Sequence, residues 1–160
     1  MQTLSQLRQE SPIEGAGVGA AVDQTHLVDA LFRAIRWFGA PSLVLRLDVA
    51  NGARCVVSGD PAAWERALSD LLARAAAASP DGVEVHVSLM ATDEGVRITV
   101  QDAGASLCGN DLVAASQAPN IVETRALVES AGGSMFFTSD PDRPGTRVEI
   151  VVGPAGEADV

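Results

Sequence analysis

The chain has 160 residues, of which 47% are apolar and 20% are charged, a composition typical of a globular domain. Its formal net charge is −10 and its 11 basic residues are all arginine, so it lacks the basic face that binds nucleic-acid phosphates. No apolar run approaches the roughly 20 residues that span a bilayer, and the N-terminus lacks the pattern of a signal peptide. We therefore expect a soluble, cytoplasmic domain that binds neither nucleic acid nor membrane.

The first part of the chain predicts a leader, one helix and two strands. Residues 1–21 are polar and then rich in glycine and alanine without a sustained period, so we expect a flexible leader. Apolar residues at helical spacing predict a helix over 23–38, which Gly39 ends. Alternating leucines predict a strand over 42–49, and a short apolar run predicts another over 53–59.

The second helix carries the clearest start signals. Asp60 is the expected N-cap and Pro61 the first helical residue. Trp64 and the leucines that follow it form an expected buried stripe, and the sequence SPDG ends the helix at 79–82. Beyond it, the Gly/Ala/Ser-rich stretch 103–119 predicts no element. The remaining expected elements are strands over 83–90 and 96–102, a helix over 120–131, strands over 134–139 and 146–152, and a loose tail over 154–160.

A helix followed by two strands thus occurs three times. No strand–helix–strand unit carries a glycine-rich phosphate loop, so we do not expect a doubly wound sheet. The order predicts an α+β fold over residues 22–153: a two-layer α/β sandwich in which about three helices cover one face of one mixed, mostly antiparallel sheet. Cys55 and Cys108 have no metal-ligand spacing, so we expect two small buried or half-buried residues and no metal site.

Three stretches, in this order, resemble the ATP-binding catalytic domain of bacterial sensor histidine kinases, within the GHKL ATPase superfamily. The sequence SGDPAAWERALSDLLARAAAASPDG follows the family's Asp-Pro, helix and Ser-Pro-x-Gly pattern. VRITVQDAGASL follows the strand that enters the Asp-x-Gly-x-Gly box, and ALVESAGGSMFFTSDPDRPGTRVEIVV follows the closing helix and hairpin. The resemblance covers about residues 22–152 and implies the GHKL fold.

The departures from the family pattern concern the phosphate half of the site. The family's two helix asparagines, which hold magnesium and phosphate oxygens, are matched by Asp70 and Arg74. The last glycine of the box is Ser106, and the segment that would close a lid over the phosphates, residues 118–121, has no glycine. A carboxylate repels a triphosphate unless a metal intervenes, and an arginine ligates no metal. We interpret Asp70 and Arg74 as an i,i+4 ion pair; the alternative is that Arg74 pairs with phosphate in place of magnesium.

The base half departs less from the pattern. The resemblance implies that Asp102 accepts the exocyclic amine of adenine, that Gly104 leaves room for the base, and that Thr146 bonds it through water. The alternative is that Asp102 and Gly104 are an ordinary strand end and turn. The predicted remnant of a nucleotide site is therefore Asp70, Arg74, Asp102, Gly104 and Thr146, with no catalytic and no metal-binding residue.

We therefore predict a degenerate, non-catalytic domain that acts as a protein-binding regulator in two-component or anti-sigma-type signalling. Its expected partner is a histidine kinase, a response regulator or a sigma factor, and no cofactor is expected. The alternatives are a kinase-type domain that binds ATP or ADP and acts in trans, and a sensor of a small adenine-like ligand. Leu107, Leu112, Val113 and Ile121 form the expected docking surface, unless they pack on the sheet. The sequence leaves the oligomeric state open.

Overall fold

The computed structural model describes residues 23–38, 44–80, 82–105, 107, 109–139, 142 and 144–153. The expected leader and tail lie outside these residues, as do Ser106 and Cys108. The described helices are α1 (Leu27–Phe38), α2 (Pro61–Ala78), α3 (Gly109–Ser116) and α4 (Pro119–Ser130). The described strands are β1 (Gln24–His26), β2 (Val44–Ala50), β3 (Val56–Ser58), β4 (Glu84–Thr92), β5 (Gly95–Gln101), β6 (Ser134–Ser139) and β7 (Thr146–Val152).

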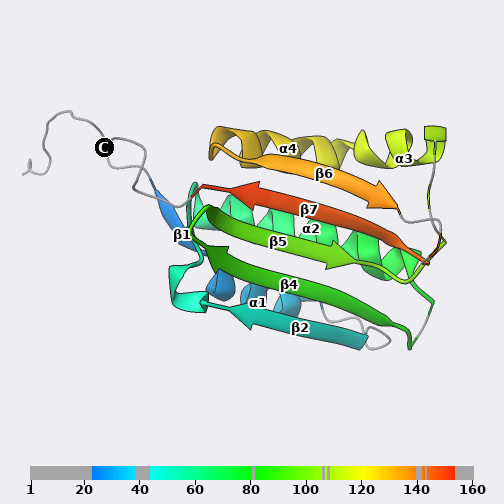
Figure 1. Ribbon diagram of the computed structural model, residues 1–160, viewed down its shortest axis with the longest axis horizontal. Coiled ribbons are helices and arrows are strands. Elements are labelled where there is room, and N and C mark those ends of the chain that lie inside the picture. Colours follow the sequence, from blue (N-terminus) through cyan, green and yellow to red (C-terminus); the bar gives the residue numbers. More distant parts are fainter. Residues whose placement is uncertain are drawn as a thin grey trace, which may run out of the picture.

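The main sheet has five strands in the order β2-β4-β5-β7-β6. Strand β2 is parallel to β4, and every other neighbouring pair is antiparallel. The helices lie together on one side of this sheet (Figure 1). The predicted α+β sandwich with a mixed, mostly antiparallel sheet is therefore confirmed. Among the described residues, no helix is both long and apolar enough to cross a membrane.

Three details of the prediction are wrong. The strand expected over 53–59 does not join the main sheet; as β3 it pairs antiparallel with β1 in a separate two-stranded sheet. Residues 24–26, expected within the first helix, form β1 because their backbone pairs with that of β3, and the Thr25 hydroxyl also donates to the Gly59 carbonyl at 2.8 Å. A fourth helix, α3, occupies part of the stretch 103–119, for which the sequence predicted no element.

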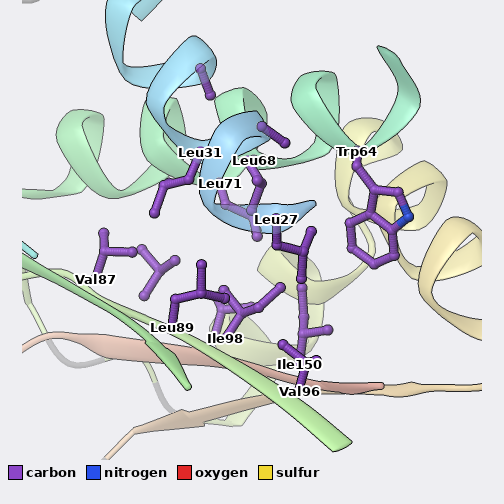
Figure 2. Close-up of a cluster of buried hydrophobic side chains, with 14 of the residues drawn as sticks. Leu27, Leu31, Trp64, Leu68, Leu71, Val87, Leu89, Val96, Ile98 and Ile150 are labelled. Atoms are coloured by element: carbon purple, nitrogen blue, oxygen red, sulfur yellow. The ribbon is translucent and has the colours of Figure 1, made fainter. Parts of the chain in front are cut away.

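The core lies between the helices and the main sheet. Along β4, β5 and β7 every second residue is buried and faces the helices, as the period of a half-buried strand requires. Figure 2 shows helix side chains and strand side chains meeting across this layer. The residues labelled there are Leu27, Leu31, Trp64, Leu68, Leu71, Val87, Leu89, Val96, Ile98 and Ile150.

Helix α2 begins as the sequence predicts. The carboxylate of Asp60 accepts the backbone N–H of Ala63 at 3.2 Å, and Pro61 occupies the first turn. The indole N–H of Trp64 donates to the Ser58 carbonyl at 2.9 Å, which anchors the start of the helix to β3. The helix packs against α1 on one side and α4 on the other. It is therefore the central element of the helical layer.

The expected docking surface is only partly at the surface. Ile121 is 1% exposed and belongs to the core, so its assignment to that surface is wrong. Leu107 and Leu112 are half-buried, whereas Val113 on α3 is 53% exposed. Ile121 is buried because it lies on the face of α4 that turns toward the core, together with Thr124 and Val128.

Candidate functional site

Asp102 follows the last residue of β5 and lies beside the first residue of β7. Its backbone N–H donates to the Thr146 carbonyl at 3.1 Å. Its carboxylate is buried, and Oδ1 accepts the backbone N–H groups of Gly104 at 2.9 Å and Thr146 at 3.1 Å. Two strands and the loop after β5 therefore fix this carboxylate in place.

The second oxygen of Asp102 faces an arginine. Arg74, on α2, donates from Nη2 to Oδ2 of Asp102 and forms an ion pair with it. The Arg74 side chain is only 16% exposed, and its guanidinium carbon lies 5.6 Å from the centre of the Phe137 ring on β6. This distance is within the range of a cation–π contact. Arg74 thus joins the helical layer to the ends of two strands.

The interpretation of Asp70 and Arg74 as an i,i+4 pair is wrong. Among the ion pairs of the described residues, Arg74 pairs with Asp102 and none joins it to Asp70. The physical reason is burial. A carboxylate as buried as that of Asp102 needs a counter-charge far more than a half-exposed carboxylate on a helix surface does.

The loop after Asp102 runs close to the end of α2. A Cβ atom on Gly104 would lie 2.0 Å from the carbonyl oxygen of Ala78, so no other residue fits there without a shift of the backbone. The Ser79 hydroxyl accepts the backbone N–H of Ala103 at 3.0 Å. The space beside Gly104 is therefore taken up by the end of α2.

Two buried polar atoms near Asp102 lack hydrogen-bond partners among the described residues: Arg74 Nε and Thr146 Oγ1. Buried polar atoms are rarely left in this state, and a water molecule or a ligand atom commonly satisfies them. The site around Asp102 thus has two polar atoms to offer besides the carboxylate. One is a donor, and the other is a hydroxyl that can donate or accept.

Asp70 lies in a different environment, at a cavity of about 170 Å³ between α2 and α4. The lining residues are Ala63, Arg66, Ala67, Asp70, Glu123, Thr124 and Leu127. Burial raises the pKa of Asp70; the positive charge of Arg66 opposes this shift and the negative charge of Glu123 adds to it. The structure therefore brings Arg74, Asp102, Gly104 and Thr146 together and places Asp70 at a second cavity.

Sequence patterns did not single out Phe137 or Glu123. Phe137 is one of several apolar residues in a predicted strand, and Glu123 is one of several polar residues on a predicted helix. Their roles depend on which residues of other elements face them, which no local pattern gives. In the described part of the chain, no group of three or more His, Cys, Asp or Glu side chains is placed to hold a metal ion.

No protein-family profile matches the chain, and no curated protein matches its sequence. Solved structures do match its fold. A mycobacterial sensor histidine kinase, MprB, superposes with a TM-score of 0.73 at 20% identity over 84% of this chain and 99% of its own.

Two further kinase structures agree with this match. The ATP-binding domain of PrrB from Mycobacterium tuberculosis gives a TM-score of 0.69 at 19% identity, covering 84% of this chain and 98% of its own. The histidine kinase AdeS of Acinetobacter baumannii gives 0.68 at 13% identity, covering 85% of this chain and 70% of its own. The chain therefore has the fold of the ATP-binding domains of sensor histidine kinases.

Proposed function

We propose that this chain is a histidine-kinase-like ATPase domain that has lost its nucleotide site and regulates signalling by binding another protein. The partner class we propose is a histidine kinase, a response regulator or a sigma factor. The observation that carries the proposal is the pairing of Arg74 with Asp102. Asp102 is the residue that, by resemblance, would receive the amine of adenine.

The base end is closed by this pair. Oδ1 of Asp102 already accepts two backbone N–H groups, and Oδ2 faces the guanidinium of Arg74. An adenine amine is an uncharged donor, and it would have to displace the guanidinium of Arg74, whose bond to Asp102 joins two opposite charges. Moving Arg74 away from Asp102 would also disturb its contact with the Phe137 ring. The contacts of Asp102 therefore disfavour adenine binding at the position where, by resemblance, the family binds the adenine amine.

The phosphate end offers few donors. Phosphates bind at helix N-termini through free backbone N–H groups. At the start of α4, Pro119 has no N–H, and the N–H groups of Ile121 and Val122 both bond to the Ala118 carbonyl at 2.9 Å. Asp70 and Glu123 outnumber Arg66 at the neighbouring cavity, which leaves one uncompensated negative charge there. A triphosphate would meet repulsion there and little to hold it.

Calorimetric titration tests the proposal. We expect no heat of binding when ATP with Mg²⁺ is added to the wild-type chain up to about 1 mM. Arg74→Asn removes the guanidinium from Asp102, so adenosine should bind this variant at least about tenfold more tightly than it binds the wild type. Arg33→Asn is the matched control, because Arg33 forms a surface pair with Glu65 on the far side of α2.

The outcomes separate the proposed function from its alternatives. Micromolar binding of ATP with Mg²⁺ to the wild type would overturn the proposal and favour a kinase-type domain that acts in trans. Binding of adenosine but not ATP would favour a sensor of an adenine-like ligand. One observation supports this second candidate: Thr146 Oγ1 and Arg74 Nε are buried without partners in the described structure, so a small ligand with suitable polar atoms would satisfy them.

A further inference from the structure

The cavity between α2 and α4 has an apolar wall and a charged mouth. Ala63, Ala67 and Leu127 supply the apolar part of its lining. Arg66, Asp70 and Glu123 supply the charges. Its volume of about 170 Å³ is below the roughly 300–1,000 Å³ of pockets that hold drug-sized ligands. The cavity therefore suits a single side chain better than a nucleotide.

The three charged residues act on one another electrostatically, because Arg66 lowers and Glu123 raises the pKa of Asp70, but none of them forms a salt bridge with a described residue. No hydrogen bond or ion pair links Arg66, Asp70 or Glu123 to a described side chain. Elsewhere on α2, by contrast, Glu65 pairs with Arg33 of α1 at 3.3 Å. Among the described residues, the charges at this cavity therefore have no direct salt-bridge partner like the one that Glu65 has.

The charge balance at the cavity favours an added cation. Two carboxylates face one guanidinium, which leaves one uncompensated negative charge. Burial and the charge of Glu123 raise the pKa of Asp70 even though Arg66 opposes the shift, and an added cation would stabilise the ionised carboxylate there. A guanidinium has planar donors that match carboxylate oxygens, and its methylene stem packs on apolar surface.

We propose that this cavity receives an arginine side chain of the protein partner, with its guanidinium between Asp70 and Glu123 and its stem along Ala63, Ala67 and Leu127. This inference rests on the proposed function, because it names a binding element of the partner. Arginine is among the residues that contribute most energy at protein interfaces. The net charge of −10 of this chain also steers a basic partner toward it.

Nuclear magnetic resonance titration of the isotope-labelled full chain tests the inference. The probes are acetyl-Gly-Arg-Gly amide and the same peptide with citrulline, which has nearly the shape of arginine without its charge. We expect the arginine peptide to shift the backbone amide signals of residues that line the cavity, with a dissociation constant on the order of 1–10 mM. The citrulline peptide should bind about tenfold more weakly.

Two double variants decide whether the site is specific. Asp70→Asn with Glu123→Gln removes both carboxylates of the cavity and should weaken arginine-peptide binding about tenfold. Asp93→Asn with Glu94→Gln makes the same change of net charge in the exposed turn between β4 and β5. At about 0.15 M salt this control should change binding less than about twofold.

Three results would overturn the inference: equal loss of binding in both double variants, equal binding of the two peptides, or shifts spread over the whole surface. A fourth would be the same amide shifts produced by MgCl₂ alone below about 1 mM, which would assign the cavity to a cation. None of these depends on nucleotide binding. Failure here therefore leaves the calorimetric result intact, and binding of ATP to the wild type would overturn the proposed function without altering these peptide titrations.

Discussion

At the scale of single residues, Arg74 and Asp102 form the most consequential contact of the molecule. The Asp102 carboxylate is buried, and its charge is compensated by two backbone N–H groups and one guanidinium. Removing one partner of a buried pair is strongly destabilising, because the other charge stays buried without compensation. Arg74 thus supplies the counter-charge for this buried carboxylate.

A double-mutant cycle measures this contact. Arg74→Met leaves the buried carboxylate without its counter-charge and should lower the free energy of unfolding by about 2–4 kcal/mol. Asp102→Asn should also destabilise, although its carbonyl oxygen still accepts backbone N–H groups. The double variant should be more stable than the sum of the two losses predicts, with a coupling of at least about 1 kcal/mol in urea unfolding.

The surface pair of Arg33 and Glu65 is the control for this cycle. Its side chains are 49% and 26% exposed, so water already screens the two charges. Arg33→Met and Glu65→Gln should show a coupling below about 0.5 kcal/mol. If the losses of unfolding free energy at Arg74 and Asp102 were simply additive, the two side chains would not stabilise the fold through their contact.

At the scale of elements, helix α2 was predictable and helix α3 was not. Local sequence signals predict the start of α2: Asp60 as N-cap, Pro61 at the first helical position, and the helical spacing of Trp64 and the leucines. Helix α3 buries none of its residues, so it has no apolar stripe for a periodicity argument to detect. Strand β1 could not be predicted either, because three residues are too few to show an alternating pattern and its partner β3 lies about 30 residues later.

Four predicted site residues lie together in the structure, namely Arg74, Asp102, Gly104 and Thr146, but their contacts and the separate location of Asp70 were not predicted. The resemblance pointed to Arg74 and Asp102, and local spacing then suggested Asp70 as the partner of Arg74. The actual pair joins residues 28 positions apart, and only the packing of α2 against the end of β5 brings them together. The proximity of Asp70 and Glu123 likewise depends on how α2 and α4 pack.

The contact between α2 and α4 predicts a pH-dependent effect at Asp70. The pKa of Asp70 is raised in the folded chain, so its ionised form destabilises the fold at pH values above that pKa. The destabilisation disappears as pH falls through the folded-state pKa toward the ordinary value of 3.8. Asp70→Asn should therefore raise the unfolding temperature at pH 7.5 by about 1 °C, and this gain should shrink toward pH 4.5.

Differential scanning calorimetry at several pH values measures this effect. The side chain of Asp93 is fully exposed in a turn, so Asp93→Asn provides a matched change of charge without burial. We expect that control to leave the unfolding temperature nearly unchanged at both ends of the pH range. A stabilisation by Asp70→Asn that grew as pH fell would contradict the assignment, because protonated aspartate and asparagine carry the same charge.

At the scale of the whole molecule, the fold matches that of ATP-binding domains of sensor histidine kinases, and the chain carries a large excess of acidic residues. The chain carries 21 acidic and 11 basic residues. Of the arginine–carboxylate pairs in the described structure, only that of Arg74 has both side chains largely out of water. The other arginine–carboxylate pairs of the described residues are exposed to water and contribute little, so the net charge of −10 acts mainly through repulsion among acidic residues.

The acidic excess also predicts how salt changes stability. Raising NaCl from about 10 to 300 mM shortens the Debye length from about 30 Å to about 6 Å, which screens the repulsion among acidic residues. The same salt weakens exposed ion pairs, but each of these contributes only about 0–1 kcal/mol. Repulsion across a chain of net charge −10 should dominate, so the urea midpoint should rise with salt. The double variant Asp93→Asn with Glu94→Gln lowers the excess of negative charge and should reduce the rise of the urea midpoint with salt. A midpoint that fell with salt would show that the attractive ion pairs dominate instead.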